Sequence, residues 1–199
     1  MQLTQADKEK LEQWWQHALA HPQELPPGLE LVHTRLVRSV GHGQLPDAGS
    51  VFVKLMWFPR AKDQLRYLLR SLPGVHEAAV FEHCRERGVR VPTVVAVRKC
   101  RWFGIPRASM LVTAGLPVQP GLASPEAVVV AVQQLIAANL FHPDLHAGNF
   151  LPLEDGTAAV VDASAWEVPP IFSWLQQNGH VPIDDMMRTF NMGLGLVIV

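Results

Sequence analysis

Three polar residues in the second half of the sequence have the types and spacing that phosphoryl transfer requires. Asp144 is followed five residues later by Asn149, and Asp162 comes thirteen residues after that. In phosphoryl transfer one carboxylate orients and deprotonates the attacking hydroxyl, while an amide oxygen and a second carboxylate hold the magnesium ion that bridges the nucleotide phosphates. The set favours this chemistry over the alternative, an Asx-rich turn that follows a helix.

Upstream, Lys54 is the one cation in an apolar run, Val51-Phe-Val-Lys54. A buried ammonium group must be paired. Glu77 is the expected partner and Glu82 the reserve; the lysine would then hold the α- and β-phosphates of ATP while the glutamate fixes its position. Two alternatives stay open: Lys54 snorkels from an edge strand, or Glu77 is a solvated helix residue.

Two histidines, His142 and His146, flank Asp144 and raise the question of a zinc site. Pro143 rules out the helical spacing that would align them, and the sequence offers no further ligand pair. The pattern therefore does not favour zinc.

The hydrophobic pattern predicts the elements that must position these residues. Thr4 and Asp7 cap a first helix, which ends at His21-Pro22 and contains the pair Trp14-Trp15. The six tryptophans are all expected in the core. Further along we expect strands at 28–40 and 51–56 around a loop at 41–49, a short leucine-striped helix at 65–72, a helix at 75–87 closed by Gly88, strands at 94–98 and 109–113, a helix from Ser124 to about Leu140 that is buried on nearly every face, and strands at 150–153 and 158–161 around a turn.

The composition describes one medium-sized domain. The chain has 199 residues, a formal charge of −1, 48% apolar residues and two cysteines in unrelated contexts. A chain of this length can bury a core without disulfides or a structural metal, which excludes disordered, collagen-like and disulfide-scaffold classes. Without an apolar leader or an 18-residue apolar stretch, a cytoplasmic location is expected, with peripheral contact with the inner membrane as an option.

The net charge is small, but basic and acidic side chains are concentrated in different segments of the chain. Residues 1–53 carry 4 basic and 6 acidic side chains, residues 54–107 carry 12 and 4, and residues 108–199 carry 1 and 8. This pattern is typical either of two solvated faces or of a site that grips phosphates on one side and divalent cations on the other. The arginine-rich stretch from Arg60 to Arg107 favours a solvated face or a contact with anionic lipid, and no nucleic-acid partner is expected.

The stretch from Val51 to Asp162 resembles the bacterial Kdo and heptose kinases of the lipopolysaccharide core, which have a protein-kinase-like fold. The resemblance rests on Val-Phe-Val-Lys54, on the run from His76 to Pro92 that includes Glu77, and on His-Pro-Asp144-Leu-His-Ala-Gly-Asn149 with Val-Val-Asp162. It implies an α+β fold with a small β-rich N-lobe and a helical C-lobe, and a kinase that transfers phosphate from ATP, with Mg²⁺, to a sugar hydroxyl of a lipopolysaccharide-core acceptor.

The same resemblance implies a role for each site residue. Lys54 and Glu77 bind the nucleotide phosphates, Asp144 is the catalytic acid/base, and Asn149 and Asp162 hold the metal. The sequence departs from the family pattern in two places: the phosphate-covering loop has only Gly41-His-Gly43 in place of a full glycine-rich motif, and Ala163-Ser164 follows Asp162.

The last part of the chain, residues 162–199, resembles the C-terminal end of phosphoribosylformylglycinamidine cyclo-ligase, also called aminoimidazole ribonucleotide synthase, of purine biosynthesis. Its pattern predicts helices at 170–177 and 183–190 and an apolar strand at 194–199. We therefore expect an N-terminal helix at 1–27, a kinase-like domain with a truncated C-lobe at 28–163, and a foreign α/β tail at 164–199. The kinase is the first hypothesis; a truncated or chimeric inactive kinase-like protein and a fragment of a cyclo-ligase are the alternatives.

Overall fold

The structure of the protein, a computed structural model, describes residues 3–35, 37–141, 149–160, 166–167 and 178–179. It divides into two compact units, residues 1–83 with 91–117 and residues 84–90 with 118–199. Among the described residues, no helix has both the length and the apolar character needed to cross a membrane.

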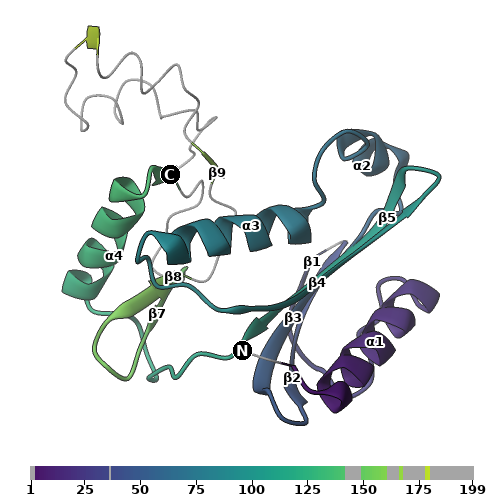
Figure 1. Ribbon diagram of the computed structural model, residues 1–199, viewed down its shortest axis with the longest axis horizontal. Helices are drawn as coiled ribbons and strands as arrows, with labels where there is room; N and C mark the ends of the chain where they lie inside the picture. The colour runs from purple at the N-terminus through teal and green to yellow at the C-terminus, as the bar shows by residue number, and fades with distance from the viewer. Residues whose placement is uncertain (1–2, 36, 142–148, 161–165, 168–177, 180–199) are drawn as a thin grey trace. The chain divides into compact units, whose positions relative to one another are not determined.

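The first unit is built on a five-stranded antiparallel sheet in the order β1-β2-β3-β5-β4 (Figure 1). Its strands are β1 (Glu30–Arg35), β2 (Arg38–Leu45), β3 (Gly49–Trp57), β4 (Val94–Trp102) and β5 (Ile105–Ala114). Strand β3 lies in the middle of this order, bonded to β2 on one side and to β5 on the other. A residue of β3 is therefore held by main-chain hydrogen bonds on both sides.

Helix α1 (Gln5–Ala20) packs on one face of this sheet. The predicted cap is present as a capping box between Thr4 and Asp7. The Asp7 carboxylate also accepts hydrogen bonds from the backbone N–H groups of Asp47 and Ala48, at 2.9 and 3.3 Å, and the bond from Asp47 lowers the pKa of that carboxyl. At the other end of the helix, the Trp57 indole N–H donates to the Ala18 carbonyl at 2.8 Å. Both ends of α1 are thus tied to the turn or strand that it covers.

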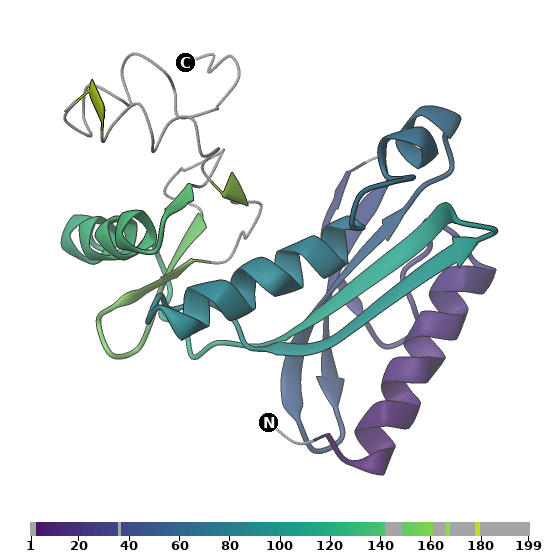
Figure 2. The ribbon, with the colours of Figure 1, turned by 45° about the horizontal axis from the view of Figure 1, so that its top comes forward.

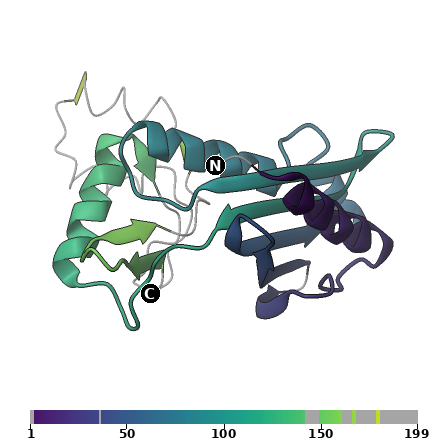
Figure 3. The same cartoon turned by 60° about the horizontal axis from the view of Figure 1, so that its bottom comes forward.

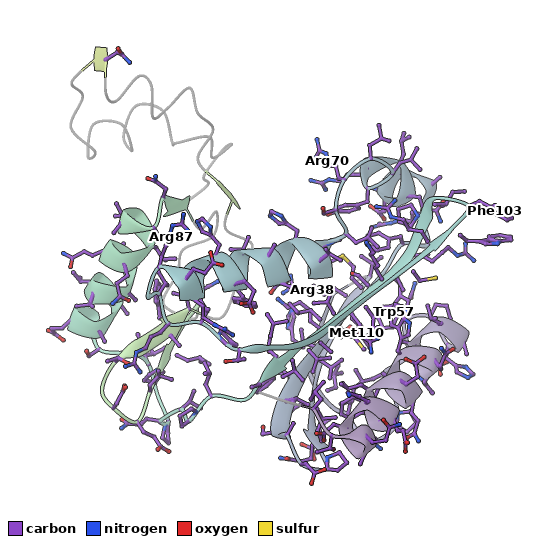
Figure 4. All side chains as sticks on the ribbon, in the orientation of Figure 1. Arg38, Trp57, Arg70, Arg87, Phe103 and Met110 are labelled. Carbon is purple, nitrogen blue, oxygen red and sulfur yellow. The ribbon has the colours of Figure 1, made fainter. Side chains whose placement is uncertain are left out.

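The core of the first unit lies between α1 and the sheet. Trp14 and Trp15 are buried there, as expected from the sequence. They pack with the alternate residues of β3 and with residues of β5, a set that includes Val51, Val53, Leu55, Trp57, Met110 and Val112. Figure 4 shows the labelled Trp57 and Met110 in the region between the sheet and α1. Trp102, by contrast, is 60% exposed, so the expectation that every tryptophan is in the core was wrong.

The strand expected at 28–40 is in fact two strands. The pairing of Arg35 with Arg38 shows that the chain reverses between them, and β2 continues to Leu45 through part of the expected loop. The sequence did not reveal this hairpin because its turn contains none of the glycine, asparagine or aspartate residues that mark such turns.

The pair Gly41 and Gly43 also has a different place from the one expected. Both residues lie in β2, paired with Val53 and Val51 of β3. A Cβ atom at Gly43 would meet Leu29 Cδ2 at 2.5 Å and the Trp14 ring at 3.2 and 3.3 Å, and one at Gly41 would meet the Leu25 and Leu29 side chains at 3.0 and 3.1 Å. These glycines allow close packing on the sheet, and the prediction that they form a phosphate-covering loop was wrong.

Helices α2 (Ala61–Arg66) and α3 (Pro73–Glu86) separate β3 from β4. Figure 2 shows the sheet with α1 on one side and α3 on the other. The expected end of α3 is present, since Gly88 adopts a φ of +75° and the Val89 N–H bonds to the Cys84 carbonyl. The leucine-striped helix expected at 65–72 was wrong: α2 ends at Arg66.

The second unit contains α4 (Pro125–Ala137), β6 (Leu140–Phe141), β7 (Phe150–Pro152), β8 (Ala158–Val160) and β9 (Trp166–Glu167). Strands β7 and β8 form a hairpin, and β6 pairs with β9. Figure 3 shows α4 next to the β7–β8 hairpin. Ser124 caps α4 as expected, with its hydroxyl accepting from the Ala127 N–H at 3.2 Å.

Helix α4 is less buried than its sequence predicted. Within the helix only Ala131 and Leu135 are buried, whereas Val129 and Val130 are about half exposed. An apolar helix was expected to be enclosed on nearly every face, and this was wrong because one narrow stripe makes its packing contacts. The expected elements of the tail, at 170–177, 183–190 and 194–199, lie outside the described residues.

Candidate functional site

Lys54 occupies a central position on β3, on the face of the sheet opposite α1. Along β3 the buried residues alternate from Val51 to Trp57, and Lys54 falls on the other face. Val40 of β2 and Leu111 of β5 pair with it on either side. Its side chain is only 17% exposed, so it does not snorkel from an edge strand. The sequence could not reveal that β5 lies beside Lys54, because strand order does not follow from strand pattern.

Glu77 is the partner of Lys54. It lies in the second turn of α3, and its side chain is 10% exposed. The Lys54 ammonium donates to Glu77 Oε1. The ion pair expected from the sequence is therefore present, and the alternative that Glu77 is a solvated helix residue is wrong. Glu82, the reserve partner, is not needed for this pair.

The ion pair holds the Lys54 ammonium group in a defined position on the face of the sheet opposite α1. An ammonium group has three N–H donors, and the pair with Glu77 engages one carboxylate oxygen. The remaining donor capacity can bind an anion such as a phosphate oxygen. The contact with Glu77 limits the rotamers that the lysine side chain can adopt.

Asn149 is the one member of the predicted catalytic-loop set that the structure describes. It is 4% exposed and immediately precedes β7. Asp144 and Asp162, and with them His142 and His146, lie outside the described residues. The structure therefore does not bring the predicted metal ligands together or separate them, and their roles stay predictions.

The hairpin that follows Asn149 is held by a tight network at its turn. The Asp155 carboxylate accepts from the Thr157 hydroxyl at 2.6 Å and from the Thr157 N–H at 3.0 Å, and it pairs with Arg90. The hydrogen bond from the Thr157 side chain is the main reason that the pKa of Asp155 is lowered. Gly156 completes the turn with a φ of +80°. This network fixes the turn that joins β7 to β8.

Within the ranges that the structure describes, no group of three or more histidine, cysteine, aspartate or glutamate side chains could hold a metal ion. Any metal site of the kind predicted would have to use Asn149 together with residues beyond those ranges.

Comparison with solved structures identifies the fold. A chain described as WaaP in complex with acyl carrier protein matches with a TM-score of 0.53. The match covers 96% of this chain and 94% of that chain, with 17% sequence identity. The protein has a kinase-like fold. At this level of identity the likeness concerns the fold alone, and the five-stranded antiparallel sheet agrees with it.

Comparison with curated proteins supports the second resemblance. Phosphoribosylformylglycinamidine cyclo-ligase of Chromobacterium violaceum is 51% identical over 47 residues, which are 24% of this chain and 14% of that protein. The Coxiella burnetii enzyme is 60% identical over 42 residues, 21% of this chain and 12% of that protein. The chloroplastic enzyme of Arabidopsis thaliana is 51% identical over 45 residues. The C-terminal part of the chain is thus similar to these cyclo-ligases, and the chain spans only 12–14% of the length of the two bacterial ones. No protein-family model matches the chain.

Proposed function

We propose that the protein is an ATP-dependent kinase that transfers phosphate to a sugar hydroxyl, with an acceptor of the lipopolysaccharide-core type. The observation that carries this proposal is the ion pair between Lys54 on the central strand of the sheet and Glu77 on α3. The kinase-like fold and the spacing of Asp144, Asn149 and Asp162 support it. The domain boundaries at 28–163 and 164–199 belong to the same proposal.

In this mechanism each residue has one task. Lys54 binds the α- and β-phosphates, and Glu77 holds the ammonium group in place. Asp144 orients the acceptor hydroxyl and takes its proton as the hydroxyl oxygen attacks. Asn149 and Asp162 would hold Mg²⁺. ATP would supply the transferred phosphoryl group and leave as ADP, and a metal held by these residues would neutralise charge on the phosphates.

The described residues fit such a ligand. A lysine that is largely enclosed and already paired has lost much of its hydration, so it offers a preorganised cation to a phosphate. The amide of Asn149, also enclosed, has the oxygen that magnesium prefers.

The test separates catalysis from binding. Asp144→Asn should abolish phosphate transfer from ATP to a core oligosaccharide acceptor while leaving the thermal shift produced by Mg-ATP nearly intact. Lys54→Met should reduce that shift, because it removes the phosphate-binding cation. Transfer at the wild-type rate by the Asp144→Asn variant would overturn the assignment.

A second candidate function is favoured by the cyclo-ligase matches. If a foreign segment has replaced part of the helical C-lobe, the chain is an inactive kinase-like protein that has lost its acceptor site. A ligand that binds only the folded state raises stability by RT ln(1 + [L]/Kd). No thermal shift at millimolar Mg-ATP would favour this candidate, and a clear shift would oppose it.

Two further candidates concern partners and chemistry. A fragment of a cyclo-ligase would have to show cyclo-ligase turnover as the isolated chain, although it spans only a small part of that enzyme.

Acyl carrier protein is bound to WaaP in the matched structure and is a candidate partner here. Co-purification of acyl carrier protein with the full chain would support that partnership.

A further inference from the structure

One end of the first unit carries a group of large apolar side chains exposed to solvent, here called the hairpin patch. Its residues come from the segment at the end of α2 and just after it, and from the β4–β5 hairpin (Figures 1 and 4). They are Leu65 (74% exposed), Leu68 (42%), Leu69 (97%), Trp102 (60%), Phe103 (88%) and Ile105 (39%). Single exposed apolar residues are ordinary, but six that gather on two adjoining segments indicate an interaction surface.

Arg101 joins the two segments into one surface. Its guanidinium group donates to the carbonyls of Tyr67 and Leu68 at 2.9 and 3.0 Å, and to those of Arg70 and Gly104 at 2.7 and 2.9 Å. One side chain on the hairpin thus satisfies three carbonyls of the α2–α3 segment. This arrangement fixes the exposed leucines beside the exposed aromatic residues.

The tip of the hairpin keeps an aromatic residue where the backbone favours a different type. Phe103 has a φ of +47° and Gly104 a φ of +80°, between the paired residues Trp102 and Ile105. A two-residue turn with positive φ at both positions favours Asn-Gly. A phenylalanine there is strained and, at 88% exposure, gains little from packing within the fold. The Phe103 ring contacts the Trp102 ring, with 5.5 Å between the ring centres, but Trp102 is itself 60% exposed. Strain together with so little burial points to a role outside the fold.

The surroundings of the hairpin patch are strongly basic. Residues 60–70 and 98–107 contain eight lysines and arginines and one acid, Asp63, which is paired with Arg60 at 2.7 Å. Arg66 and Arg70 are exposed among the leucines. The Arg107 guanidinium lies 5.5 Å from the centre of the Trp102 ring. An aromatic ring with a cation beside it can lie at the boundary between lipid chains and phosphates.

From these observations we propose that the hairpin patch is a membrane-docking surface, in which Trp102, Phe103 and Leu69 insert into the interfacial layer of an anionic bilayer while the surrounding arginines bind lipid phosphates. Apolar insertion and attraction to anionic lipid add in such binding. The protruding tip favours a bilayer over a protein partner, because a bilayer accepts a convex apolar tip without a matching groove. The inference does not depend on kinase activity.

The test is flotation of the full chain with lipid vesicles, without nucleotide. We expect binding to phosphatidylcholine vesicles that contain about 30% phosphatidylglycerol and weak binding to pure phosphatidylcholine, because the attraction requires anionic lipid. Phe103→Asn should weaken binding about tenfold, since it removes an inserted ring. The same substitution suits the turn, so its melting temperature should equal or exceed that of the wild type, which separates lost binding from lost folding.

The basic residues are tested with a matched pair of variants. Arg66→Gln with Arg70→Gln should weaken binding to anionic vesicles by about 25-fold, at about fivefold for each cation removed. Lys8→Gln with Lys10→Gln on α1 removes the same charge and, like the first pair, one cation that lies over an aromatic ring. This control should bind nearly as the wild type does.

A second control removes apolar area away from the hairpin patch. Val129→Ser with Val130→Ser, both half exposed on α4, should leave binding unchanged. Three results would overturn the proposal: no flotation with anionic vesicles, equal loss in the α1 and hairpin-patch variants, or wild-type binding by Phe103→Asn. If vesicles are not bound but the hairpin-patch variants lose a soluble protein partner, the surface serves protein docking instead.

Discussion

The ion pair between Lys54 and Glu77 should contribute a large coupling energy to folding. The side chains are 17% and 10% exposed, so the pair lies between a surface ion pair and a fully buried one. At about 4 Å and an effective dielectric constant of about 20, the attraction between two unit charges is about 4 kcal/mol. Desolvation offsets part of this attraction, and we expect a coupling energy of about 2–3 kcal/mol.

The perturbation is a double-mutant cycle with Lys54→Met and Glu77→Gln. Each single variant leaves one charge enclosed without its partner and should lower the free energy of unfolding by about 2–3 kcal/mol. The double variant should cost no more than one single variant, because no unpaired charge remains. Urea unfolding without nucleotide measures the three differences.

The control cycle uses the more exposed pair Arg60 and Asp63, whose side chains are 44% and 20% exposed. An i,i+3 pair of this kind should show a coupling of about 0.5 kcal/mol or less, and added salt should reduce it. The reasoning about Lys54 would be refuted if its coupling energy were as small as that of the control. Lys54 would then be an ordinary surface cation.

Four further outcomes follow from the structure. Gly43→Ala should destabilise the fold by about 1–3 kcal/mol in urea unfolding, because its methyl group would press on the buried Trp14 ring. Thr4→Ala should cost about 1 kcal/mol by the same measurement, since it removes the side-chain half of the capping box on α1. Burial raises the pKa of the Cys84 thiol to about 11 from 9.0, so a thiol reagent at mildly alkaline pH should label Cys100 and spare Cys84 until the chain unfolds. Because the folded state keeps that proton longer, stability should fall as pH rises from about 9 through about 11, by up to about 2 kcal/mol, and the Cys84→Ala variant should lack this loss.

Structural features that depend on the residue types of a short segment could be predicted from the sequence. The caps at Thr4 and Ser124 and the glycine at Gly88 set the ends of three helices, because each satisfies or terminates backbone groups within a few residues. The pair of Lys54 with Glu77 could be predicted for a similar reason. A cation in an apolar strand requires a partner, and the following helix offered few acids.

Structural features that depend on contacts between residues far apart in the sequence could not be predicted. The turn between β1 and β2 has no residue that signals it, so one strand was predicted where there are two. The leucines after α2 look like a helical stripe, but Arg101 holds that segment by its carbonyls and leaves Leu65 and Leu69 exposed. Nothing in the segment itself reveals an arginine some thirty residues later that binds its carbonyls.

The attachment of α1 at both ends has a practical consequence for any shortened form of the protein. Asp7 bonds to the turn between β2 and β3, and Ala18 accepts from Trp57 at the far end of β3. Removing the first 27 residues would expose Val51 and its buried neighbours along β3, so that a broad apolar face of the sheet would be in contact with solvent. A chain that starts at residue 28 should therefore aggregate into inclusion bodies. Helix α1 is needed for folding and should be kept in any shortened form that is expressed.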